Sequence, residues 1–253
     1  MKFQTKSRLI YLRRARHRSG HGIHSPFLYR LITTVIEDKQ NLSNYQYLKD
    51  LKKSALKLLG NSSDPLITEL FKKFSLPVSK PRKLYRNVEM PLKYAKVVFR
   101  LIRELKPDAV ISYGDTLGIN LSAAAMAQNP AYLYQVIHKP EYHLFCEKLF
   151  INSEVSNIQW INEHIESSVN AEFTIINYPD QPELTENILH KSLTIHGDQD
   201  ILIVRGIHES AKMETIWSEL IASNAVRVSL DLFEIGIVLF FKKLQKENFI
   251  YHF

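Results

Sequence analysis

The sequence is poor in cysteine and has no long apolar run. Among its 253 residues there is one cysteine, Cys146, which excludes an internal disulfide and a zinc site built from several cysteines. No apolar run reaches the ~20 residues that span a bilayer, and no apolar signal-peptide core opens the chain. Together with 45% hydrophobic and 23% charged residues, these absences predict a soluble globular protein of a reducing, cytoplasmic setting.

Acidic residues are absent from positions 1–18, although this arm holds seven of the 33 basic residues. Without the arm, the chain has 26 basic and 26 acidic residues, so the net charge of +7 belongs to the arm. An arm of this kind suits nucleic acid, an anionic membrane surface or an acidic partner. The alternatives are a solvated helix with a basic face and a transit peptide, which is typically rich in arginine and poor in acids.

Glycine and proline divide the chain into parts. Residues 1–60 read as helices, interrupted by the segment SGHGIHSPF, because two glycines and a proline do not continue a helix cheaply. Three prolines within 61–86 predict a looser connector. We therefore expect a basic arm and helical extension over residues 1–86, followed by a second domain over 87–253.

A regular alternation of helices and strands begins at Pro91. Apolar residues at helical spacing lead to Pro107, and they are followed by an apolar strand over 109–113, a glycine turn and a helix over 119–128. Further strands alternate with helices, and three strands close the chain. This pattern predicts an α/β fold with a mainly parallel sheet, an antiparallel edge and helices on both faces. Ligands of such folds bind at the carboxyl ends of the strands, which places the glycine turn at the expected site.

Four segments resemble a group of bacterial class I S-adenosylmethionine-dependent methyltransferases: RARHRSGHGIHSPFLY, GDTLGIN, IHESAKMETIW and DLFEIGIVLFFKK with the closing NFIYHF. The similarity covers nearly the whole chain. It implies a Rossmann-like sheet of about seven strands, with S-adenosylmethionine as the cofactor lying over the first turn.

The resemblance also implies roles for particular residues. It places the methionine end of the cofactor on the turn, the ribose beside the second strand, and the adenine or methionine near the fourth. The residues concerned are Gly114, Asp115, Thr116 and Gly118, then His138 and Lys139, then Asn177. His208, after the fifth strand, is a candidate for a catalytic base. Its alternative role is a loop histidine that caps the helix beginning near Ser210.

The cofactor motif departs from the family pattern where the family carries acids. Ser112 stands two residues before the first glycine, His138 follows the second strand, Asn177 follows the fourth and Arg205 closes the fifth. A cation at Arg205 repels a sulfonium, unless the side chain turns away and pairs with an acid such as Glu209. Other acids lie close in sequence to strand ends, namely Asp115, Glu141, Glu163 and Asp180.

Two functions therefore stay open at the level of sequence. One is methyl transfer from S-adenosylmethionine to an acceptor that the sequence does not identify. The other is a non-catalytic module of the methyltransferase fold, with a cleft that prefers anions and a basic arm as its contact surface. We expect no metal site, because Gly20 and Gly22 disrupt the helical spacing of His17, His21 and His24. Cys146 lies in a helical pattern and is expected to be a small buried hydrophobe.

Overall fold

The computed structural model describes residues 3–15, 23–40, 42–127, 132–151, 153, 155, 157–162 and 171–253. The chain forms two compact units, each assembled from segments that are separate in the sequence. Unit 1 comprises Met1–Asp38, Ala109–Tyr113 and Asn170–Phe253, and unit 2 comprises Lys39–Asp108 and Gly114–Val169. The boundary expected after residue 86 stays a prediction.

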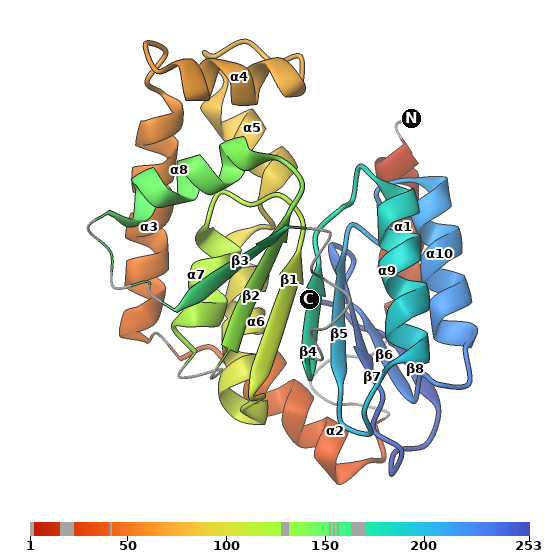
Figure 1. The fold of residues 1–253 in the computed structure, drawn as a ribbon. Helices are drawn as coiled ribbons and strands as arrows, with labels where there is room; N and C mark the ends of the chain where they lie inside the picture. The colour runs from red at the N-terminus through yellow and green to blue at the C-terminus, as the bar shows by residue number, and fades with distance from the viewer. Residues whose placement is uncertain are drawn as a thin grey trace. The chain divides into compact units, whose positions relative to one another are not determined.

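Unit 1 contains both ends of the described chain and most of the strands (Figure 1). A π-helical segment, Leu31–Ile36, directly continues its second helix. The elements of unit 1 are α1 (Phe3–Arg14), α2 (Pro26–Arg30), β1 (Ala109–Tyr113), β4 (Phe173–Ile176), α9 (Pro182–Thr194), β5 (Ile201–Arg205), α10 (Ala211–Ala222), β6 (Val228–Asp231), β7 (Ile235–Leu239) and β8 (Glu247–Ile250).

Unit 2 is richer in helices and carries the glycine turn. Its helices α3, α6 and α7 contact one another, and α7 and α8 contact β2. The elements of unit 2 are α3 (Ser43–Leu59), α4 (Pro65–Lys73), α5 (Pro81–Val88), α6 (Leu92–Leu105), α7 (Ile119–Ala125), β2 (Tyr132–Ile137), α8 (Pro140–Phe150) and β3 (Ile158–Asn162).

The strands form an eight-stranded sheet in the order β3-β2-β1-β4-β5-β7-β6-β8. Strand β4 runs parallel to β1 and β5, and β3 runs parallel to β2. Strand β7 is antiparallel to both β5 and β6, and β8 is parallel to β6. The expected α/β fold is confirmed, with one strand more than the seven that the resemblance implied.

The segment that was expected to be a looser connector, 61–86, holds two helices instead. Pro65 and Pro81 stand in the first turns of α4 and α5, where their missing N–H groups cost no helical hydrogen bond. The side chain of Asp64 caps α4 by accepting the Leu66 N–H at 3.0 Å. The prolines therefore start helices here rather than prevent them.

The segment around SGHGIHSPF likewise leads into a helix. Ser25 precedes α2, its hydroxyl accepts the Leu28 N–H at 3.4 Å, and Pro26 occupies the first turn. Residues 16–22, which include His17 and His21, lie outside the described part of the chain. The interruption expected between the helices is therefore described only over residues 23–25, which precede α2.

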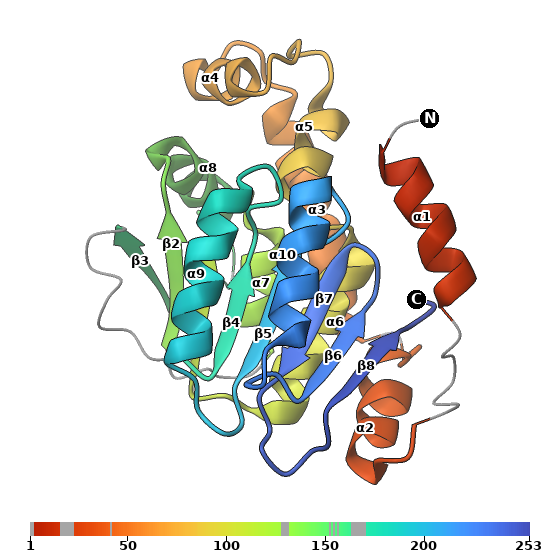
Figure 2. The ribbon, with the colours of Figure 1, turned by 90° about the vertical axis from the view of Figure 1, so that its right-hand side faces the viewer.

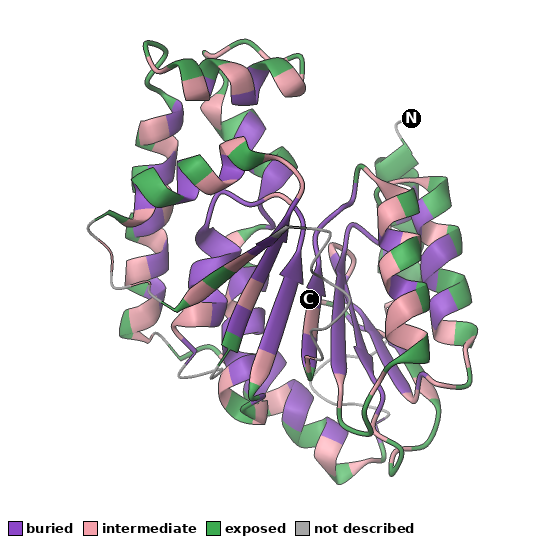
Figure 3. Cartoon of the chain, viewed as in Figure 1, coloured by how far each residue is buried: buried purple, intermediate pink, exposed green. Residues whose placement is uncertain are grey.

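Helices α9 and α10 of unit 1 lie side by side in both ribbon views (Figures 1 and 2). The ring of Trp217 on α10 occupies the space where a Cβ at Gly236 of β7 would stand, so this glycine allows the helix to approach the sheet closely. The strand interiors of β5 and β7 are buried along their whole length (Figure 3).

Helix α1 is attached to the rest of unit 1 through Tyr11. This side chain is 5% exposed, its hydroxyl donates to the Tyr251 carbonyl, and its ring lies 5.1 Å from the ring of Phe233. The other side of the helix exposes Leu9 and Leu12 among basic side chains. In the described ranges, no helix combines the length and apolarity required to cross a membrane.

Candidate functional site

The glycine turn of unit 2 begins directly after β1. Gly114 and Gly118 have φ values of 119° and 93°, a region of backbone conformation that favours glycine. A Cβ at Gly118 would lie 2.8 Å from a ring carbon of Phe150 on α8. Both glycines are therefore required for this turn, by their backbone conformation and, at Gly118, by the close packing of α8.

The turn encloses a carboxylate that comes from outside the motif. Glu89, the residue that ends α5, is 1% exposed. Its Oε1 accepts the Thr116 hydroxyl at 2.7 Å and the Leu117 N–H at 2.6 Å, and its Oε2 accepts the Asn120 N–H at 3.2 Å. Because all three of these groups donate, Glu89 fits the site as an ionised acceptor.

Thr116 connects the glycine backbone to this carboxylate. The Gly118 N–H donates to the Thr116 hydroxyl oxygen at 2.9 Å, and the same hydroxyl donates to Glu89. The motif residues thus bind an acid of their own chain. Sequence reasoning missed Glu89 because it looked for acids only at strand ends. The available signal was a lone acid two residues before Pro91, at the end of a strongly amphipathic helix.

A second polar side chain of the turn was also missed. Asn120 is 6% exposed, and neither atom of its side-chain amide has a hydrogen-bond partner among the described residues. A buried amide without partners costs free energy unless something outside the described chain completes it. Asn120 is therefore a candidate for contact with a ligand.

The residues after β2 bring a charge pair to the turn. The Lys139 ammonium lies 3.2 Å from Oδ2 of Asp115, so each charge is balanced by the other. His138 follows β2 and is half-buried. The buried Gln135 amide donates to the Gly114 carbonyl at 2.6 Å and fixes the first residue of the turn.

The positions after β4 and β5 belong to unit 1 and form a pair of their own. A guanidinium nitrogen of Arg205 donates to the Asn177 side-chain oxygen at 2.9 Å, and both residues are buried. Burial raises the pKa of Glu209, while the charge of Arg205 opposes this rise. Arg205 therefore donates to the Asn177 amide and acts on Glu209 through its charge, while the pairing with Glu209 or Asp180 considered from the sequence stays a prediction.

His208 of unit 1 lies between two carboxylates. Its Nδ1 is 2.8 Å from Glu214 and its Nε2 is 2.8 Å from Asp231. Burial opposes the charged imidazolium, but hydrogen bonds and charges from Asp231 and Glu214 outweigh it and raise the pKa. Ser210, rather than His208, caps α10 by accepting the Met213 N–H at 3.2 Å.

The remaining candidates from the sequence are three acids and Cys146, whose thiol donates to the Thr116 carbonyl at 3.6 Å. Glu141 pairs with Lys73 at 2.6 Å, Asp180 is exposed and Glu163 lies outside the described residues. Cys146 is buried as expected, and burial raises the pKa of its thiol well above the usual range. Within the described ranges, no group of three acidic, histidine or cysteine side chains is arranged to hold a metal ion.

Comparison with known proteins finds similarity in structure but not in sequence. No protein-family model matches the sequence, and no curated protein matches it. The O-methyltransferase TomG from Streptomyces achromogenes, solved in complex with SAM, matches with a TM-score of 0.50 and 12% identity over 84% of this chain and 93% of that chain.

Two further solved structures give similar values. The O-methyltransferase from Bacillus cereus, solved in complex with SAH, matches with a TM-score of 0.51 and 10% identity over 77% of this chain and 96% of that chain. The SAH-bound methyltransferase PaMTH1 from Podospora anserina matches with a TM-score of 0.50 and 10% identity over 79% of this chain and 98% of that chain. These likenesses establish the fold, which is the Rossmann-like α/β fold of these methyltransferases.

Proposed function

We propose that the chain binds S-adenosylmethionine at the glycine turn of unit 2. The single observation that carries this proposal is the buried Glu89 carboxylate enclosed by Thr116, Leu117 and Asn120. The ligands in the neighbouring structures, SAM and SAH, support the choice of ligand. The bound cofactor would supply a methyl group on a sulfonium.

Charge is the reason why Glu89 suits this ligand. S-adenosylmethionine carries an ammonium and a sulfonium, and a buried carboxylate attracts both more strongly than an exposed one does. Lys139 does not cancel this attraction, because its charge is balanced by Asp115. Glu89 would thus supply the negative charge that is missing at Ser112, where the family carries an acid. Its carboxylate argues against a cleft that prefers anions.

Some hydrogen-bond donors of the turn are used by Glu89, and another is available to a ligand. Glu89 already occupies the N–H groups of Leu117 and Asn120, so a ligand carboxylate needs another donor. The side-chain amide of Asn120 is buried and has no partner among the described residues, which makes it the donor that we assign to this carboxylate. His138 is assigned to the ribose, as the resemblance implied.

A non-catalytic module is the second candidate function, and His208 favours it. Both ring nitrogens lie at hydrogen-bond distance from carboxylates, and the raised pKa favours the imidazolium, which has no lone pair to accept a proton. On this hypothesis the chain binds its ligand without transferring the methyl group. His208 then holds unit 1 together instead of acting as a base.

Calorimetric titration with S-adenosylmethionine and S-adenosylhomocysteine tests the binding proposal. The second ligand lacks the sulfonium charge, so we expect the wild type to bind the first one more tightly. Glu89→Gln should lower this preference at least about fivefold, a difference on the order of 1 kcal/mol. Glu147→Gln is the matched control, because Glu147 is an exposed acid of the same unit.

A second variant guards against misfolding of Glu89→Gln. Asp115→Asn leaves the Lys139 charge unbalanced and should weaken S-adenosylmethionine binding, and Lys139→Met in the same chain should restore it. If neither ligand produces heat at millimolar concentration while the wild type is folded, the binding proposal is wrong. If both bind equally well in the wild type and in Glu89→Gln, the carboxylate has no role in the attraction.

We also propose that the basic arm contacts an anionic surface. Helix α1 has no acidic residue and exposes Leu9 and Leu12 beside Arg13, so it offers both basic and apolar side chains to a lipid headgroup region. Arg13→Glu together with Arg14→Glu should reduce retention on phosphatidylglycerol vesicles in low salt. Unchanged retention, or retention on RNA alone, would contradict this proposal.

A further inference from the structure

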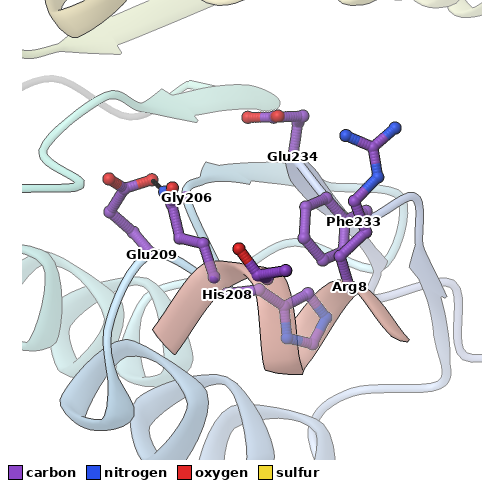
Figure 4. Close-up of a pocket in the computed structure, with 8 residues that line it drawn as sticks. Arg8, Gly206, His208, Glu209, Phe233 and Glu234 are labelled. Carbon is purple, nitrogen blue, oxygen red and sulfur yellow. Dashed lines mark hydrogen bonds between the residues drawn. The ribbon is translucent and has the colours of Figure 1, made fainter. Parts of the chain in front are cut away.

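A cavity of about 300 Å³ lies within unit 1 at the end of β5, with α1 as one wall. The remaining wall comes from the segment after β5 and from the loop between β6 and β7 (Figure 4). Its volume is at the lower end of the range for small-molecule sites. Neither the glycine turn nor Asn177 contributes to it.

The acidic side chains come from two segments that line this cavity. Figure 4 shows Glu209 on one side of Gly206 and Glu234, Phe233 and Arg8 on the other. The guanidinium of Arg8 lies 5.8 Å from the centre of the Phe233 ring. The guanidinium of Arg8 therefore already makes a cation–π contact with Phe233.

The second basic group is compensated more completely. His208 lines the cavity, and its two nitrogens lie 2.8 Å from the carboxylates of Glu214 and Asp231. An imidazolium between two carboxylates contributes no net positive charge. Glu209 and Glu234 therefore give the lining a surplus of negative charge, although the charge of Arg205 also acts on Glu209.

The backbone at Gly206, between the two glutamates, carries no side chain. Gly206 has a φ of 72°, and a Cβ there would overlap the Cβ of Pro179. The Gly206 N–H is already bound, since it donates to the Glu234 carbonyl at 2.7 Å. The Gly206 N–H is therefore not offered to a ligand anion, and the side-chain amide of Gln4, which also lines the cavity, donates to Glu209.

Phe233 lies across the cavity from Glu209, and several contacts hold it in place. It has a φ of 73°, which is unusual for a residue other than glycine, and its N–H donates to Oδ1 of Asp231 at 2.8 Å. Its ring stacks on His208 with 5.2 Å between the ring centres. The cavity therefore combines the aromatic ring of Phe233, which these contacts hold in place, with the carboxylates of Glu209 and Glu234.

We propose that this cavity binds an organic amine, whose ammonium lies between Glu209 and Glu234 and whose apolar part lies toward Phe233. An anion is disfavoured by the two carboxylates. A metal ion is disfavoured because the described residues provide no group of three ligating side chains. Burial raises the pKa of Glu209, and the attraction of a paired cation would offset this cost of desolvation.

The test uses benzylamine and benzyl alcohol, which have nearly the same shape and differ in charge at neutral pH. In low-salt calorimetry of the full chain, we expect benzylamine to bind with a Kd below about 1 mM and benzyl alcohol to bind at least about tenfold more weakly. Glu234→Gln should weaken benzylamine binding by a similar factor. Glu219→Gln is the matched control, because Glu219 is an exposed acid on α10 that does not line the cavity.

Three outcomes would overturn the proposal: equal binding of the amine and the alcohol, no binding of either, or Glu234→Gln behaving like Glu219→Gln. Glu234 is a half-buried loop residue, and a thermal unfolding curve confirms that the variant is folded. The proposal does not depend on S-adenosylmethionine binding. Glu234→Gln should leave the affinity for S-adenosylmethionine unchanged, and Glu89→Gln should leave the affinity for benzylamine unchanged, so failure of one proposal is distinguishable from failure of the other.

Discussion

Glu89 of unit 2 and His208 of unit 1 are both ionisable side chains held by hydrogen bonds, but their partners differ. Glu89 accepts from a hydroxyl and two backbone N–H groups within one short turn. His208 contacts carboxylates from α10 and from β6. Glu89 thus gathers donors from one short stretch of the chain around its carboxylate, whereas His208 joins segments that are distant in the sequence through two carboxylates.

The largest expected effect is on the free energy of unfolding, and it compares Gly206 of unit 1 with Gly118 of unit 2. Gly206→Ala should lower the free energy of unfolding by about 2–6 kcal/mol, because a positive φ costs ~1–3 kcal/mol and the new Cβ overlaps Pro179, adding ~1–3 kcal/mol. Gly118→Ala has the same backbone problem, but its Cβ meets the end of the Phe150 ring, which is able to shift. We expect about 1–3 kcal/mol there.

Urea unfolding of both variants measures this difference. The exposed Ala222→Gly change at the end of α10 serves as a control for a glycine–alanine exchange outside these turns, and it should cost less than about 1 kcal/mol. A cost for Gly118→Ala equal to or above that for Gly206→Ala would mean that the Phe150 ring is as rigid as the backbone near Pro179.

Glu89→Gln should have the next largest effect, about 2–4 kcal/mol of unfolding free energy. The amide retains one acceptor but turns an NH₂ group toward either the Leu117 or the Asn120 N–H, so one buried donor loses its partner. Urea unfolding at pH 7 measures the loss. Glu147→Gln should stay within about 0.5 kcal/mol of the wild type, because Glu147 is exposed.

A loss no larger than that of Glu147→Gln would show that the turn holds its shape without the carboxylate. The proposal that unit 2 carries a functional negative charge would then lose its structural basis. A loss of the expected size in Glu89→Gln combined with unchanged ligand preference would instead assign Glu89 to folding alone.

The sequence predicted what is periodic and local. The strand over 109–113 and the helix ending before Pro107 follow from patterns within a few residues, and both are present as β1 and α6. The segment 61–86 was misjudged because proline was read as a helix breaker, although its effect depends on position. Pro65 and Pro81 lie in first turns, where they favour a helix.

The candidate site was less accessible to sequence reasoning. The motif predicted the turn from Gly114 to Gly118. The negative charge at this turn comes from Glu89, which lies 25 residues before the turn begins and belongs to no recognisable motif. The partners of His208 are similarly remote, since Asp231 follows 23 residues later. Spacing along one chain does not encode contacts that only the packing of separate elements creates.

The smallest expected effect is the pH dependence that His208 contributes. Its pKa is raised in the folded state, so its stabilising effect is complete below the ordinary histidine pKa and is lost as pH rises through the raised value. The free energy by which the wild type exceeds His208→Gln should therefore decrease from pH 6 to pH 9. The decrease reports the loss of the imidazolium charge.

Urea unfolding of both proteins at pH 6.0, 7.5 and 9.0 gives this difference, and taking the difference cancels groups that titrate alike in both. His190→Gln is the control, since His190 is exposed on α9. A difference that grows with pH would mean that a neutral imidazole, donating to one carboxylate, is the stabilising form. His208 would then have a lone pair again, which would return it to the role of a base and weaken the contrast between the two regions.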